Sequence, residues 1–159
     1  MDQNTLEARV ARIEDREAIR TLRHTYHNIL NERQLERWGE IYTPDALVVI
    51  DYAATWKGVA EIEAGFKIAA RRLTFLKQYL HNHEITLNGD TATAYAYFEA
   101  RYVDDGESVM VAGKYDEKYL RTSAGWRITE TKVTLDFSVP LSKGWAGETR
   151  NTLKPFEKV

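Results

Sequence analysis

The four histidines are the side chains of this sequence best suited to acid–base chemistry near neutral pH. His81 and His83 stand two residues apart at the start of a predicted strand, so both can point to the same strand face. Each is a candidate catalytic residue. A histidine that only forms a hydrogen bond at the edge of a pocket is, however, more common than a catalytic one. His24 and His27 flank Tyr26, which shares an apolar helix stripe and is a candidate pocket residue.

Further candidates stand where predicted strands end or alternate. Asp51 and Tyr52 close the first predicted strand, and one of them could face the mouth of a pocket. Tyr115 alternates with Gly113, Glu117 and Tyr119 on one face of a later strand. We expect these positions to contact a substrate. A metal site is not expected, because His81 and His83 lack a third ligand.

Composition excludes several classes of function. The chain has 159 residues, no cysteine, and 22 Lys and Arg against 24 Asp and Glu, for a formal net charge of −2. The absence of cysteine rules out disulfides, thiolate metal sites and a cysteine nucleophile. The balanced charge gives no attraction to nucleic acid or to an anionic membrane. No apolar run resembles a signal peptide or a membrane span, so a cytoplasmic protein is expected.

The elements that must position these residues form two groups along the chain. Three-residue and four-residue apolar spacing predicts helices over 6–30, 35–41 and 59–70. Period-two patterns and turn residues predict strands over 46–52, 84–87, 91–103, 108–121 and 126–137. Helices followed by an antiparallel meander indicate the α+β class, with helices packed on one face of a curved sheet.

The strand over 91–103 has two unlike faces. One face carries Phe98 among small residues, Ala94, Ala96 and Ala100, and the other carries tyrosines and charges. Small residues beneath helices are equally consistent with a cavity and with a close fit for bulky helix side chains. The tyrosine-bearing face predicts a subunit interface.

Three stretches resemble the SnoaL-like branch of the NTF2-like superfamily. They are the helix running from Leu6 to Tyr26, the segment QYLHNHEITLNGDTA from Gln78 to Ala92, and the strand pair from Gly113 to Ile128. Together they reach from the first helix to about Phe137. The similarity is closest to bile-acid 7α-dehydratases, and weaker to scytalone dehydratase and hexachlorocyclohexane dehydrochlorinase.

The resemblance implies a cone-shaped α+β barrel with an apolar pocket, and chemistry without a cofactor. Tyr26 matches the pocket tyrosine of the dehydratases, which assists the leaving group or polarises a carbonyl. The catalytic His–Asp pair of the family is replaced by Gln78 and Asn31, which can orient a substrate oxygen but cannot act as a base. A one-residue shift in the alignment would turn Arg101 inward in place of Ala100.

The leading hypothesis is therefore a cofactor-independent lyase or isomerase, dehydratase-like or cleaving a C–C bond by a retro-aldol or deformylating route. Its substrate is a hydrophobic cyclic or aromatic small molecule. The alternatives are a binding domain without catalysis and a polyketide cyclase. A single domain over 1–159 is expected, with 138–159 as a C-terminal tail or lid, in a homo-oligomer that is a dimer or trimer.

Overall fold

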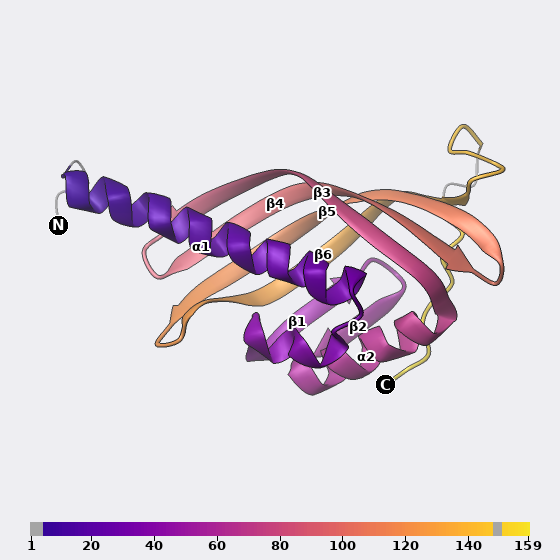
Figure 1. Ribbon diagram of the computed structural model, residues 1–159, viewed down its shortest axis with the longest axis horizontal. Helices are drawn as coiled ribbons and strands as arrows, with labels where there is room; N and C mark the ends of the chain where they lie inside the picture. Colours follow the sequence, from indigo (N-terminus) through magenta and orange to yellow (C-terminus); the bar gives the residue numbers. More distant parts are fainter. Residues whose placement is uncertain (1–4, 148–150) are drawn as a thin grey trace.

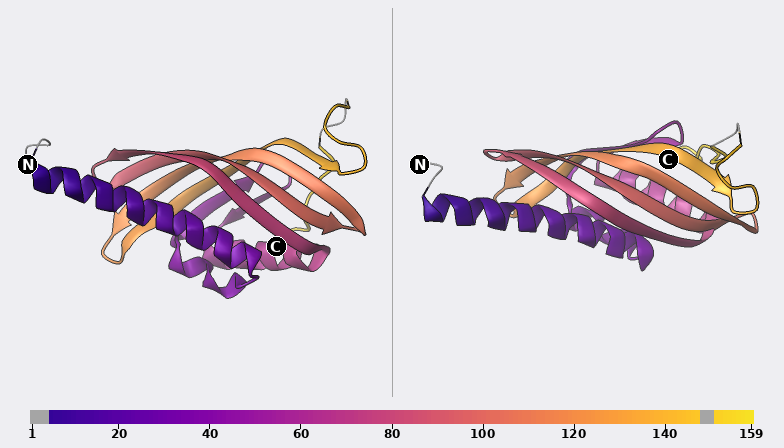
Figure 2. Two further views of the ribbon diagram at one scale, coloured as in Figure 1. Left: turned by 45° about the horizontal axis from the view of Figure 1, so that its top comes forward. Right: turned by 90° about the horizontal axis from the view of Figure 1, so that it is seen from above.

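The computed structural model describes residues 5–147 and 151–159. Three helices and six strands follow one another along the chain: α1 (Leu6–Asn31), η1 (Leu35–Glu40), β1 (Tyr42–Ile50), β2 (Ala54–Lys57), α2 (Val59–Arg72), β3 (Leu73–Asn88), β4 (Thr91–Asp104), β5 (Glu107–Thr122) and β6 (Gly125–Pro140). The strands form one sheet in the order β2-β1-β6-β5-β4-β3. Figures 1 and 2 show α1 crossing one face of this curved sheet, with η1 and α2 beside β1 and β2. The predicted α+β class and helix-on-sheet architecture are confirmed.

α1 is one continuous helix. Thr5 caps it, since its hydroxyl accepts a hydrogen bond from the Ala8 backbone N–H at 3.2 Å. Asp15 lies within this helix and does not interrupt it. Its carboxylate instead accepts hydrogen bonds from Arg121, at 2.7 and 2.6 Å, and from the Trp126 indole at 3.0 Å. These contacts fasten the middle of α1 to the β5–β6 hairpin.

The β4 strand has the two faces that its sequence predicts. Residues 92, 94, 96, 98, 100 and 102 are buried, while Tyr97 on the other face is 47% exposed. Ala100 is therefore the inward residue and Arg101 points outward, where it forms an ion pair with Glu99 at 3.2 Å. The expected inward position of Ala100 is therefore confirmed, and the alternative alignment that would turn Arg101 inward is wrong.

Several strand boundaries differ from the prediction. β3 begins at Leu73, directly after α2, rather than at residue 84, because it pairs with β4 along its whole length. β1 lies over 42–50 and pairs in parallel with β6, and the short β2 was not predicted. β6 continues to Pro140, so the tail begins after that residue and not at 138. Across residues 5–147 and 151–159, no helix has a stretch both long and apolar enough to span a membrane.

A β-bulge in β3 decides where the histidines point. Leu80 pairs with Phe98 and His83 with Ala96, so two residues of β3 stand opposite one residue of β4. The inward side chains are therefore even-numbered before the bulge and odd-numbered after it. The expectation that His81 and His83 share one face was wrong for this reason.

Candidate functional site

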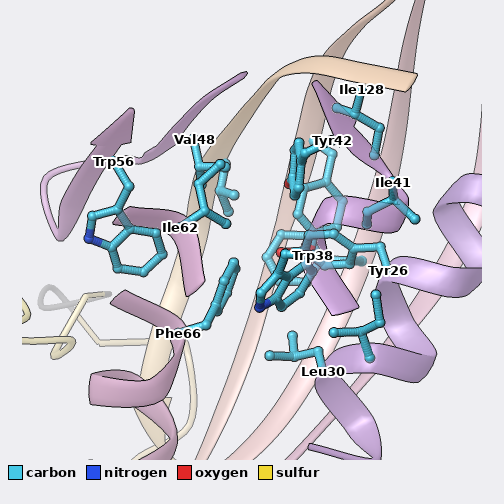
Figure 3. Packing of buried hydrophobic residues seen from close by; sticks show 14 of the residues in the cluster. Tyr26, Leu30, Trp38, Ile41, Tyr42, Val48, Trp56, Ile62, Phe66 and Ile128 are labelled. Carbon is cyan, nitrogen blue, oxygen red and sulfur yellow. The ribbon is translucent and has the colours of Figure 1, made fainter. Parts of the chain in front are cut away.

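An apolar cavity of about 80 Å³ lies between the helices and the inner face of the sheet. Strands β4 and β5 contribute Phe98 and Tyr115 to its wall, and α1 contributes Tyr26. Tyr26 packs against the stacked rings of Trp38 and Phe66, with centroids 5.1 and 6.1 Å away (Figure 3). Ala100 lines the cavity beside Phe98, whereas Ala94 and Ala96 are buried without lining it. The strand thus combines the two predicted arrangements, a cavity and a close fit.

Three polar side chains of the cavity, those of Tyr26, Tyr115 and Gln78, lie near one another, while a fourth, Tyr102, bonds instead to Ser138. The Tyr115 hydroxyl donates a hydrogen bond to Gln78 Oε1 at 2.6 Å, and the Tyr26 ring lies 5.9 Å from the Tyr115 ring. Burial raises the pKa of Tyr26, with the charge of Arg23 partly opposing it. Burial also raises the pKa of Tyr115 well above its usual value. Both phenols are therefore protonated at neutral pH and act as hydrogen-bond donors.

The Asn31 side chain forms two hydrogen bonds with the backbone of the neighbouring strand. Its Nδ2 donates to the Gln78 carbonyl at 2.9 Å, and its Oδ1 accepts from the Gln78 backbone N–H at 2.7 Å. This two-bond clamp joins the end of α1 to the edge strand β3. Asn31 does not line the cavity. It positions Gln78, whose side chain does reach the cavity.

A buried ion pair stands behind the two tyrosines. Arg23 is 0% exposed and Glu117 3%, and Arg23 Nη1 donates to Glu117 Oε1 at 3.0 Å. The guanidinium carbon of Arg23 lies 3.9 Å from the Tyr26 ring centre and 3.5 Å from that of Tyr115. The arginine therefore stabilises electron density on both phenol rings by cation–π contact.

The carboxylate of Glu117 is fully hydrogen-bonded. Its Oε2 accepts from the Tyr119 hydroxyl at 2.5 Å, and its Oε1 also accepts from Thr131 at 3.0 Å. Because Thr131 uses its proton on Glu117, its oxygen must accept the proton of Tyr42, 3.1 Å away.

Neither partner of this ion pair was singled out for the site from the sequence, although a signal was present. Arg23 falls on the helix stripe between Ile19 and Tyr26, and Glu117 on the strand face of Tyr115 and Tyr119. Two opposite charges on two apolar faces indicate a buried pair.

The histidines lie outside the cavity. His81 is on the outer side of the bulge with its side chain 51% exposed, 3.9 Å from Glu99. His83 is half-buried and neither ring nitrogen has a hydrogen-bond partner within the described part of the chain. Burial, followed by the charges of Arg23 and Arg20, lowers the pKa of His83 to about 4.

His27 is more deeply buried than His83. Its Nδ1 lies 2.9 Å from the Arg23 carbonyl, which can only accept, so Nδ1 carries the proton and Nε2 is a free acceptor. Burial and then the charge of Arg23 lower the pKa of His27 to about 3. It is neutral at physiological pH.

All four histidines line a second, open groove between α1 and β3. Gln78 is the residue that lines both this groove and the cavity, so it forms part of their common wall. Over residues 5–147 and 151–159, no cluster of three or more histidine or carboxylate side chains is placed to hold a metal ion.

Besides Asn31, three predicted substrate contacts do not line the cavity. Asp51 and Tyr52 lie in the turn after β1, where Asp51 has a φ of 33° and Tyr52 is 47% exposed. Arg101 points to the outer face, as described above. Asp51 supplies no carboxylate to the cavity, and among the residues that the structure describes the cavity lining contains no ionisable side chain other than tyrosine.

The C-terminal segment closes one side of the cavity. Leu153 and Phe156 line it, and the Phe156 backbone N–H donates to the Ala53 carbonyl at 3.0 Å. Thr152 donates through its backbone and its hydroxyl to the Ser138 carbonyl, at 2.7 and 2.8 Å. Arg72 donates to the Lys154 carbonyl at 3.0 Å.

Residues 11–132 match the family model of the SnoaL-like domain. The chain belongs to this family. The matched range contains α1 from residue 11 onward, every strand except the end of β6, and the cavity residues Tyr26, Gln78 and Tyr115. The family resemblance stated from the sequence is confirmed.

Solved structures of other members share the fold of this SnoaL-like chain. An NTF2-like protein from Novosphingobium aromaticivorans is 28% identical, with a TM-score of 0.71, covering 84% of this chain and 91% of that one. Hexachlorocyclohexane dehydrochlorinase LinA-type3 from Novosphingobium barchaimii is 20% identical, with a TM-score of 0.78 and coverage of 88% and 96%. A protein from N. aromaticivorans described provisionally as a scytalone dehydratase is 12% identical, with a TM-score of 0.74 and coverage of 93% and 97%. The last two likenesses concern the fold alone.

Proposed function

We propose that this chain is a cofactor-independent lyase or isomerase acting on a hydrophobic, ring-bearing small molecule. The observation that supports this most is an apolar cavity whose tyrosines Tyr26 and Tyr115 meet Gln78 at one end. An apolar body would fill the cavity, and its oxygen would face these three side chains.

The proposed chemistry is polarisation of a substrate oxygen. Gln78 Oε1 already accepts from Tyr115, which leaves the amide N–H groups of Gln78 to donate. Tyr26, protonated because its pKa is raised, would donate a second hydrogen bond to a carbonyl or a leaving hydroxyl. The guanidinium of Arg23 beside the ring would stabilise the negative charge that develops on Tyr26.

Elimination of water is the reaction class we favour, and retro-aldol cleavage the second within this proposal. The dehydrochlorinase of the same fold is named for an elimination, which supports this class by analogy. The cavity lining supplies no carboxylate or imidazole, so the carbon-bound proton would pass to water.

The same absence of a base within the described cavity lining favours one alternative function, binding without turnover. An NTF2-like fold with an apolar pocket is sufficient to hold a ligand. The two functions differ in whether the bound molecule is chemically changed.

We also propose that the C-terminal segment is a lid. The cavity of about 80 Å³ is smaller than the ~150 Å³ that accommodates one benzene in an engineered protein core. A larger ligand would enter by displacing Phe156 and Leu153, which are held by few backbone hydrogen bonds.

The test begins with a thermal-shift screen against sterols, phenols and diarylpropanoids, followed by mass spectrometry of each stabilising compound. Loss of water or of formaldehyde identifies dehydration or deformylation. For a converted compound, Tyr26→Phe should reduce turnover by about tenfold or more with the fold retained. Tyr97→Phe, on the outer sheet face, is the matched control. Unchanged turnover in Tyr26→Phe would remove Tyr26 from the mechanism, and stabilisation without conversion would support binding alone.

A further inference from the structure

The first turns of α1 project from the body of the protein. Figures 1 and 2 show this end of the helix extending past the strands. From Leu6 to Glu14 every side chain except Ala8 is exposed. A helix segment this short is marginal in water without tertiary contacts.

The projecting segment nevertheless carries an apolar stripe. Leu6, Val10 and Ile13 are 70%, 43% and 65% exposed and recur at steps of four and three residues. This is the spacing of core positions in a coiled coil, with Leu6 and Ile13 at d and Val10 at a. Val10 at a and Leu6 at d follow the pattern of two parallel helices, whereas Ile13 at the second d position departs from it.

The stripe faces away from the chain's own sheet. In the same heptad frame Asp15 is at position f, opposite the a and d positions. Asp15 is bound to Arg121 and Trp126 of the sheet. A second helix can therefore reach the stripe without meeting the β5–β6 hairpin.

Charges beside the stripe select the direction of that second helix. Arg9 and Arg16 occupy g, on one flank, and Glu7 and Glu14 occupy e, on the other. Parallel helices place g of one beside e of the next, so Arg9 meets Glu14 of the other copy. Antiparallel helices would place arginine beside arginine and glutamate beside glutamate. Glu17 at the following a position ends the apolar seam.

We propose that the projecting part of α1 pairs with α1 of a second copy of this chain, side by side and in the same direction. Leu6, Val10 and Ile13 form the seam of this contact, and Arg9 pairs with Glu14 across it. The contact is short, so it joins two copies whose association is concentration-dependent.

Disulfide cross-linking tests the contact directly, since the chain has no cysteine of its own. Leu6→Cys should form a disulfide-linked dimer under mild oxidation, because the two d positions lie within bonding reach. The matched control Ala11→Cys lies at an exposed position off the seam. Cross-linking of Leu6→Cys should be about tenfold or more faster at micromolar protein, because pairing raises the local thiol concentration. Equal rates would overturn the proposal.

Direction and charge are tested in the same assay. A mixture of Leu6→Cys and Ile13→Cys chains should give only dimers of like chains, whereas a predominant mixed dimer would show antiparallel helices and overturn the parallel arrangement.

In the Leu6→Cys background, Glu14→Arg should slow cross-linking and adding Arg9→Glu should restore it. Failure of the double variant to restore the rate would overturn the Arg9–Glu14 pair. Far-ultraviolet circular dichroism should show an unchanged fold in every variant.

Discussion

Gln78 separates an apolar cavity, whose polar groups are phenols and an amide, from an open groove that all four histidines line. The cavity can donate hydrogen bonds but holds no group that accepts a proton near neutral pH. The groove holds the imidazoles, two of which, His27 and His83, are kept neutral by burial and by nearby arginine charge. The cavity proposed to bind the substrate and the four imidazoles therefore lie on opposite sides of one wall.

Arg23 influences both compartments. Its guanidinium lies against the rings of Tyr26 and Tyr115, and its charge contributes to the lowered pKa values of His27 and His83. Glu117 balances this charge within the core. The contrast between the two compartments therefore depends on one buried ion pair.

The largest expected effect comes from breaking that pair. Glu117→Ala leaves Arg23 as an uncompensated buried charge and removes the partners of Tyr119 and Thr131. We expect the free energy of unfolding to fall by about 3–5 kcal/mol. Urea denaturation measures it, with Glu99→Ala on the outer sheet face as the control. A loss in Glu117→Ala no greater than in Glu99→Ala would show that the pair does not stabilise the fold.

The next effect is the pH dependence that His27 imposes on stability. Its pKa is about 3 in the fold and near 6.5 in an unfolded chain, so unfolding takes up a proton below pH 6.5. Stability is then lost as the pH falls from 6.5 toward 3, by about 2 kcal/mol for this residue at pH 5. Denaturation at pH 7 and pH 5 should show a smaller loss in His27→Leu than in the wild type. An equal loss would mean that His27 titrates normally in the fold.

Much of the fold could be predicted because it follows local pattern. The α1 stripe, the alternation of β4 and the turns at Gly89 and Gly106 are each set by residues close in sequence. The length of β3 was underestimated because its first half, which lies at the sheet edge beside α1, has no regular alternation of buried residues. Its existence depends on pairing with β4, a contact far along the chain.

The site was predictable in part. Tyr26, Phe98 and Tyr115 line the cavity, as their helix stripe or strand face indicated, and Gln78 lines it at the position singled out by the family resemblance. The orientation of His81 was not predictable, because one extra residue in a strand reverses every side chain beyond it. The hydrogen bonds between the Asn31 side chain and the backbone of residue 78 likewise depend on how α1 packs on β3, and no local sequence pattern contains this information.

The smallest expected effect tests the two sides of this bulge. His81→Ala should change the free energy of unfolding by less than about 0.5 kcal/mol, because the ring is exposed and lies 3.9 Å from its polar neighbour Glu99. His83→Ala, two residues along, removes a half-buried ring and should cost about 1 kcal/mol. Both are measured by urea denaturation at pH 7, where His83 is neutral. Equal costs would place the two rings in similar surroundings, and the bulge would then not separate the half-buried histidine from the exposed one.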